Sequence, residues 1–155
     1  MPRVKKNSRA KLLKASPYFR DWPEGNLDKL APFLKMVNYA RGEELLQENK
    51  RARFLYILLK GKVALSIRRG TGDLIIEVIK KKGALLGWSA IVPPRKYTAS
   101  AKALEDVKVL KIRGKDLEDY LQFHPPLAWQ FWQKLASLIA FRLLHARQAL
   151  AETLV

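Results

Sequence analysis

Histidines, cysteines and clustered carboxylates carry most nucleophilic, acid–base and metal chemistry in proteins, and this chain offers few of them. It has no cysteine and two histidines among its 155 residues. His124 precedes a proline, His145 lies in a helical segment, and neither is near another ligand type at useful spacing. Metal sites need clustered ligands, and neither a nucleophile–base arrangement nor a phosphate-binding Gly-Lys-Ser/Thr loop is apparent. We therefore expect no catalytic residue, no metal and no enzymatic activity.

The composition is that of a soluble, single-domain protein. Hydrophobic residues make up 48% of the chain and charged residues 28%, which is typical of globular proteins. The longest apolar runs fall well short of the roughly 20 residues that span a bilayer. A signal peptide is not apparent, and the absence of cysteine excludes disulfides and thiolate-ligated clusters. We expect a cytoplasmic protein without a membrane span.

The strongest feature of the composition is a formal net charge of +16. Such a charge favours polyanionic partners, which are nucleic acid, an anionic membrane surface or an acidic protein. Basic residues are dense in an N-terminal arm, residues 1–11, and in the run Lys80–Lys82. This charge is either a solubility feature or a binding surface, and both interpretations stay open. We find no element shaped for a DNA groove, so we expect no specific DNA binding by this chain alone.

The apolar patterns predict an α+β domain, residues 12–155, with an antiparallel β-barrel or jelly roll at its centre. Residues 12–34 have the spacing of two short helices, broken near Pro17 and Pro23. Leu55, Ile57 and Leu59 are expected to form one inward face. Short apolar runs and period-two alternation predict the strands 54–59, 63–67, 74–79, 97–103 and 107–112.

Helical periodicity returns after Gly114, and a long helix is predicted from about Leu127 to the C-terminus. A heptad on it places Trp132 and Ile139 at one seam position and Leu143 and Leu150 at the other. We therefore expect a homodimer through this helix. In the alternative interpretation its Trp129/Trp132 end packs on the barrel and the rest of the helix frays.

Several motifs, taken in order, resemble the cyclic-nucleotide-binding domain family, particularly the sensor half of Crp–Fnr-type regulators. They are Gly42-Glu43, the run Leu55–Val63, the paired glycines of Gly83–Gly87, and Thr98-Ala99. Each is weak alone, but together they are a strong indication of the fold. The glycines suit barrel corners, where a positive φ or a close approach is needed.

The resemblance implies a ligand site in the cassette that follows Gly87. In the family, a glutamate beside this glycine holds the ribose hydroxyl and an arginine some ten residues later neutralises the cyclic phosphate. Here Trp88 stands at the glutamate position and Tyr97 at the arginine position. Tryptophan accepts no hydrogen bond and tyrosine carries no positive charge, so ordinary cyclic-nucleotide binding is not expected. The implied ligand-binding residues are Gly87, Trp88, Ser89, Ala90, Arg95, Tyr97, Thr98 and Ala99.

Three interpretations of this cassette remain open. Trp88 and Tyr97 fill a vestigial pocket, or the cassette binds another small ligand, anionic or aromatic, or a shifted arginine still allows a cyclic nucleotide. In an extended segment Arg95 lies on the same side as Tyr97 and Lys96 on the opposite side. Arg95 is therefore the expected anion-binding group, and no other cofactor is expected.

The long helix is the expected output of the domain. Family members that regulate transcription continue into a winged helix-turn-helix, whereas this sequence stops at Val155 and begins at a methionine. We expect a stand-alone, non-enzymatic sensor whose ligand shifts the helix and so alters contact with a protein partner of unknown identity. The competing hypothesis is a constitutive interaction module with a filled pocket that docks on an acidic protein, RNA or anionic lipid.

Overall fold

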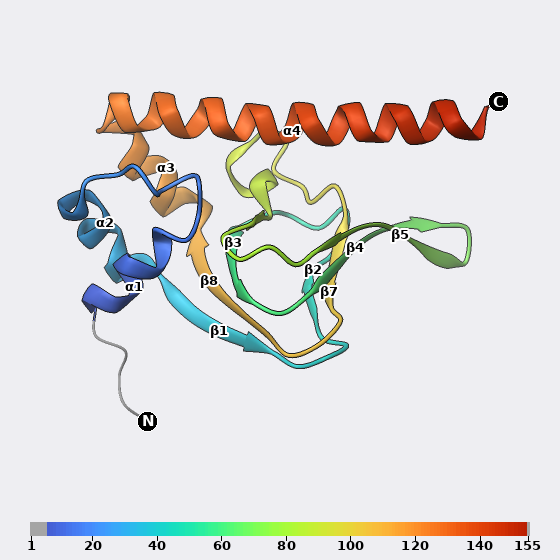
Figure 1. Ribbon diagram of the computed structural model, residues 1–155, viewed down its shortest axis with the longest axis horizontal. Helices are drawn as coiled ribbons and strands as arrows, with labels where there is room; N and C mark the ends of the chain where they lie inside the picture. The colour runs from blue at the N-terminus through green and yellow to red at the C-terminus, as the bar shows by residue number, and fades with distance from the viewer. Residues whose placement is uncertain (1–5, 155) are drawn as a thin grey trace.

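Two antiparallel four-stranded sheets form the centre of the molecule, with helices at both ends of the chain (Figure 1). The computed structural model describes residues 6–154. One sheet has the order β1-β8-β3-β6 and the other β2-β7-β4-β5. This arrangement confirms the predicted α+β jelly roll between helices. The strands are β1 (Lys35–Tyr39), β2 (Glu44–Leu46), β3 (Phe54–Lys60), β4 (Val63–Arg69), β5 (Gly72–Ile79), β6 (Leu85–Leu86), β7 (Ser100–Ala103) and β8 (Val107–Arg113).

Strand β3 is buried over most of its length. Leu55 and Ile57 are buried as expected, but the alternating residues Tyr56 and Leu58 are buried as well. A strand with one solvated face would show alternation; here both faces of β3 are covered. On the second face the Tyr56 ring packs against Tyr39, and the Tyr56 hydroxyl donates to the Leu45 carbonyl oxygen.

The N-terminal helices pack together with the start of the C-terminal helix. They are α1 (Lys6–Leu13) and α2 (Glu24–Leu30), followed by the 3-10 turn η1 (Ala31–Phe33). Ala10 and Leu13 of α1 are buried, so α1 crosses the boundary expected between arm and domain. Residues 1–5 of that arm lie outside the described residues.

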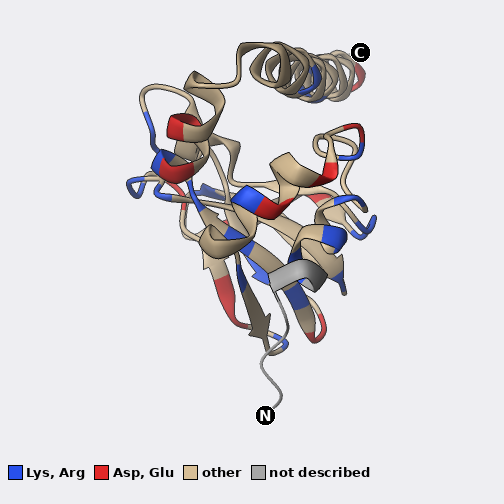
Figure 2. Cartoon of the chain, turned by 90° about the vertical axis from the view of Figure 1, so that its left-hand side faces the viewer, with Lys and Arg blue, Asp and Glu red and all other residues tan. Residues whose placement is uncertain are grey.

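The C-terminal helix α4 (Pro125–Thr153) follows the short helix α3 (Gly114–Gln122) and lies along one side of the barrel (Figures 1 and 2). Its first half is anchored: Phe131 and Leu135 are buried, and the Phe131 ring lies 5.5 Å from that of Phe19. The second half is helical to Thr153, as the predicted long helix requires. Leu143 and Leu150, two of the predicted seam residues, are 51% and 60% exposed.

The segment predicted as a strand over 97–103 is shorter than expected. Strand β7 begins at Ser100, and the preceding residues form a loop held to β3. A bend at Thr98 and Ala99 separates β7 from the single bridge between Lys96 and Arg51. Arg95, just before this segment, has a φ of 60°, a left-handed conformation.

In the turn before β6, the barrel approaches the loop after α1 closely, and a substitution at Gly83 tests this contact. Gly83 has a φ of +92°, and a Cβ there would overlap the Ala15 carbonyl group, whereas Gly70 has a φ of +61° with open space around it. We expect Gly83→Ala to lower the free energy of unfolding by about 3 kcal/mol. Gly70→Ala, the matched control, should cost about 1 kcal/mol from backbone strain alone. Equal losses in urea denaturation would contradict this account.

Candidate functional site

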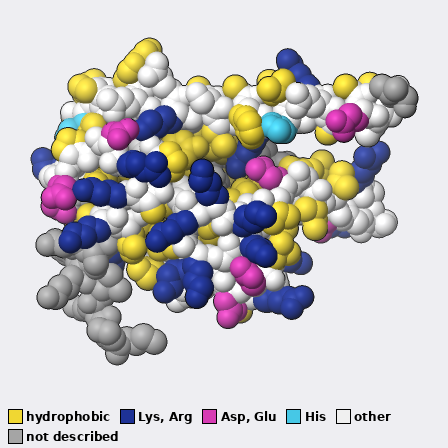
Figure 3. All heavy atoms as spheres, in the orientation of Figure 1, with side chains coloured by type: hydrophobic (Ala, Val, Ile, Leu, Met, Phe, Trp, Pro, Cys, Tyr) yellow, Lys and Arg dark blue, Asp and Glu magenta, His cyan; other side chains and the backbone are white. Residues whose placement is uncertain are grey.

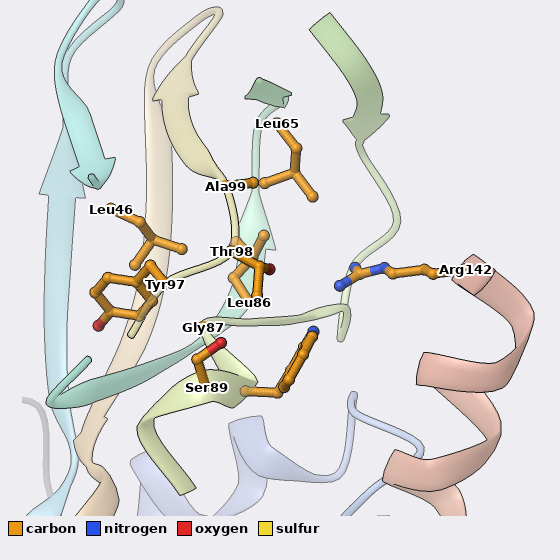
Figure 4. A pocket seen from close by; sticks show the side chains of 10 residues that line it. Leu46, Leu65, Leu86, Gly87, Ser89, Tyr97, Thr98, Ala99 and Arg142 are labelled. Atoms are coloured by element: carbon orange, nitrogen blue, oxygen red, sulfur yellow. The ribbon is translucent and has the colours of Figure 1, made fainter. Parts of the chain in front are cut away.

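The candidate site is a small cavity between the barrel and α4. Its volume is about 30 Å³, enough for a small ion or a few water molecules and far below the roughly 300–1,000 Å³ of ordinary ligand pockets. Figure 4 shows residues of four elements and the connecting cassette converging on it. The lining residues are Leu46, Leu65, Leu86, Gly87, Trp88, Ser89, Tyr97, Thr98, Ala99 and Arg142.

Most of the predicted site residues come together here. The 3-10 turn η2 (Trp88–Ile91) begins after Gly87, which has a φ of 77°. A Cβ at Gly87 would lie 2.8 Å from the Phe54 carbonyl oxygen, so this position requires glycine. Ser89 is buried at the cavity, and Trp88 is half-buried beside it. The cassette therefore places Gly87, Trp88, Ser89, Tyr97, Thr98 and Ala99 around one cavity.

Tyr97 joins the cassette to the barrel instead of holding a ligand charge. Its hydroxyl donates to the Phe54 carbonyl oxygen at 2.8 Å and accepts from the Phe54 N–H at 3.2 Å. Burial raises the pKa of Tyr97, and these backbone contacts partly oppose the rise. The phenol is therefore neutral at physiological pH and has its hydrogen-bonding capacity satisfied by the backbone.

Two predicted site residues lie outside the cavity. The Arg95 guanidinium forms an ion pair with the Glu118 carboxylate on α3, with a second contact of 3.1 Å, and also donates to the Ala90 carbonyl oxygen. The expectation that Arg95 reaches the cavity beside Tyr97 is wrong, because its left-handed backbone turns the side chain toward α3. Ala90 is buried but packs against Gly114 at the base of η2 rather than lining the cavity.

Arg142 on α4 is the basic residue at the cavity, and no local sequence pattern indicates its place there. Its Nε lies 3.4 Å from a Glu77 carboxylate oxygen on β5. That distance makes an ion pair, but the group is not aligned for a hydrogen bond, so the buried Nε–H has no acceptor among the described residues. A buried donor of a charged group that lacks an acceptor is unfavourable.

The fold and the motifs agree with a comparison to known families. The family model for the cyclic nucleotide-binding domain matches residues 36–124. The chain belongs to this family. The match covers nearly all of the barrel and α3, and so includes β3 and the cassette, whereas Arg142 of α4 lies outside it.

Similar proteins place this domain in varied settings. The chain is 28% identical over 144 residues to a voltage-gated inwardly rectifying potassium channel of Rattus norvegicus. The matched region is 92% of this chain but only 14% of the channel. A putative cyclic nucleotide-binding protein from Geobacter metallireducens is 25% identical, with a TM-score of 0.74, covering 86% of this chain and 97% of that one. The sensor domain of the transcriptional regulator DNR from Pseudomonas aeruginosa has the same fold, with a TM-score of 0.75, 21% identity, and coverage of 89% and 93%.

Within the cyclic-nucleotide-binding family, this chain is a domain of the regulatory type. A group of three or more possible metal-ligating side chains does not occur in the described part of the chain. Among residues 6–154, none of the helices is long and apolar enough to cross a membrane. The two positions that depart from the family pattern, Trp88 and Tyr97, both line the cavity.

The Tyr97 contacts predict a pH-dependent effect of Tyr97→Phe. At pH 7 we expect a loss of about 1–2 kcal/mol in the free energy of unfolding, since the Phe54 N–H loses its acceptor. Because the folded-state pKa of Tyr97 is raised, the unfolded chain releases this proton first. The free energy of unfolding of wild type should therefore fall as pH rises above about 10. That of Tyr97→Phe should fall less steeply. Urea denaturation from pH 7 to 11 measures both, and identical slopes would contradict the account.

Proposed function

We propose that this chain is a non-enzymatic regulatory domain that senses an anion smaller than a cyclic nucleotide. Its cassette has lost ordinary cyclic-nucleotide recognition, and α4 carries both the charge that binds the ligand and the response to it. The observation that carries this proposal is the exchange of arginines: Arg95 is paired with Glu118, whereas Arg142 of α4 lies at the cavity.

The loss of ordinary nucleotide recognition is supported by charge and by size. Trp88 cannot accept a proton from a ribose hydroxyl, and the Tyr97 hydroxyl is already bound to the Phe54 backbone. Tyr97 also carries no positive charge at the position where the family resemblance implies an arginine for the cyclic phosphate. The cavity of about 30 Å³ also leaves no room for a base and a ribose.

A small oxyanion or carboxylate fits the groups that remain. The Arg142 side chain is 24% exposed, so its charge is only partly hydrated and an anion gains more from it than from a surface arginine. The hydroxyls of Ser89 and Thr98 are further donors at the same cavity (Figure 4). Planar guanidinium groups bind carboxylates and phosphates in a two-point geometry.

Binding at Arg142 would affect α4, because the same side chain pairs with Glu77 of β5. An anion in the cavity competes with the Glu77 carboxylate, and the pair that holds the middle of α4 to β5 then weakens. A ligand shifts an equilibrium through such a difference in contacts. The helix beyond Arg142, which is largely exposed, is the segment free to respond.

A change in α4 would be transmitted through its contact with another protein chain. We propose a homodimer, or contact with a protein partner in the cytoplasm, through the face that carries Trp132, Ile139, Leu143 and Leu150. Trp132 and Ile139 are half-buried against the core, and Leu143 and Leu150 are exposed. Exposed leucines on a helix that extends past the barrel favour a helical partner.

A second candidate function is a constitutive module that docks on a polyanion while its pocket is filled. The sheet supports it: Lys35 lies opposite Lys111, and Lys60 opposite Lys108. Like charges in register destabilise a sheet, and Figure 3 shows many Lys and Arg side chains over the barrel. Burial, with a smaller contribution from Lys35, lowers the pKa of Lys111, as expected where positive charge gathers.

Two arginine variants separate these candidates. We expect inorganic phosphate or acetate to change the fluorescence of Trp88 saturably in wild type, with Trp88→Phe used to assign the signal. Arg142→Gln should weaken the midpoint at least about tenfold, which corresponds to about 1.4 kcal/mol. Arg95→Gln, the matched control with the same loss of charge, should leave it unchanged.

The opposite results would count against the sensor. If Arg95→Gln abolishes the response and Arg142→Gln does not, the assignment of the anion-binding arginine is wrong. If wild type shows no saturable response to either anion, the filled-pocket module is favoured instead.

A further inference from the structure

A second and much larger hollow lies on the other side of Arg142, away from the cassette. Its volume is about 420 Å³, within the range of ordinary small-molecule pockets. It is bounded by the loop after α1, the end of β5, the connection to β6 and the middle of α4. We call it the lysine groove, because Lys80, Lys81 and Lys82 all line it.

The floor of the lysine groove is apolar. It is formed by Tyr18 and Leu85, which are buried, by Leu138, which is half-buried, and by Phe141, which is 58% exposed. Burial raises the pKa of Tyr18, although the nearby Arg142 opposes the rise, so the phenol is neutral at physiological pH. This floor suits the hydrocarbon or aromatic body of a ligand.

The walls of the groove are fixed before any ligand arrives. The Gly83 N–H donates to the Leu58 carbonyl oxygen at 2.7 Å, and the Ala84 N–H to the Lys81 carbonyl oxygen at 3.1 Å. Gly83 also packs directly on the backbone of Ala15. The turn that carries the three lysines is therefore held to β3 and to the loop after α1, and a ligand would lose little free energy in ordering it.

The charge of the groove is strongly unbalanced. Four basic residues line it, Lys80, Lys81, Lys82 and Arg142, against the single acidic residue Glu77. Glu77 is itself paired with Arg142, so its carboxylate does not neutralise the lysines. Consecutive lysines at an apolar pocket repel one another, and an anionic group between them relieves that repulsion.

We propose that the lysine groove is a second ligand site, which binds a free amphipathic anion with a carboxylate or phosphate head and an aliphatic or aromatic body. The head lies among Lys80–Lys82, and the body lies on Tyr18, Leu138 and Phe141. The bounded volume favours a single small molecule over a membrane surface. This inference does not depend on which anion the cassette cavity binds, because the lysines and the apolar floor do not line that cavity.

The test measures the binding of decanoate, used as the probe, to the whole chain of residues 1–155. By calorimetry we expect one saturable site with a Kd below about 1 mM, and at least about tenfold weaker binding of the neutral decanol. The variant Lys80→Ser/Lys81→Ser/Lys82→Ser should weaken decanoate binding at least tenfold. The matched control Lys50→Ser/Lys60→Ser/Lys62→Ser, which loses the same charge at exposed positions outside the groove, should bind as wild type does.

A second variant tests the apolar floor. Phe141→Ser changes an exposed side chain, so it should fold normally, and we expect it to weaken decanoate while leaving the phosphate response at Trp88 in place. The proposal is overturned if wild type does not bind decanoate or if both lysine triplets lose binding equally. It is also overturned if the lysines matter only for binding to phosphatidylglycerol vesicles, which would make this a membrane-contact surface.

Discussion

The hydrogen bonds between the Tyr97 hydroxyl and the Phe54 backbone are the interaction on which the candidate site depends. They bind the end of the cassette to β3 at the position where the family resemblance implies an arginine facing a phosphate. Tyr97 also lines the cavity, whose volume is about 30 Å³. The backbone must turn just before Tyr97, and that turn directs Arg95 to Glu118 on α3. Tyr97 therefore contributes hydrogen bonds to the backbone of β3 and no positive charge to the cavity.

Helix α4 supplies the positively charged side chain at the cavity, Arg142, because the cassette places none there. Its first half is fixed by Phe131 and Leu135, and Lys134 donates to the Pro17 carbonyl oxygen at 2.7 Å. Further along the helix than these anchors, Arg142 contacts Glu77 on β5. Arg142 also lines both the cassette cavity and the lysine groove. The Arg142 side chain therefore lines both hollows, and it is carried by α4 just before the exposed part of that helix. Such a position is where ligand binding could most directly alter the helix.

The sequence predicted the fold well because its indicators are local. Period-two alternation, turn glycines and the helical spacing after Gly114 each depend on residues close in the chain, and the structure has strands, turns and helices in those places. The predicted cassette residues other than Ala90 and Arg95 line one cavity. Arg95 pairs with Glu118 instead, and its left-handed backbone interrupts the alternation of side chains that placed it beside Tyr97. Arg142 and Glu77 are 65 residues apart and meet only in the folded chain. No spacing rule brings such a pair together.

The central claim, that this member of the family has lost ordinary cyclic-nucleotide recognition, is tested most directly by titrating the wild-type protein with cAMP and cGMP. Calorimetry should be followed in parallel with tryptophan fluorescence, because Trp88 lies at the cavity. The account predicts neither heat of binding nor a saturable fluorescence change at nucleotide concentrations up to about 1 mM, a limit that corresponds to about 4 kcal/mol of binding free energy. Micromolar binding of either nucleotide would contradict it and would mean that the cavity opens and another basic group neutralises the phosphate.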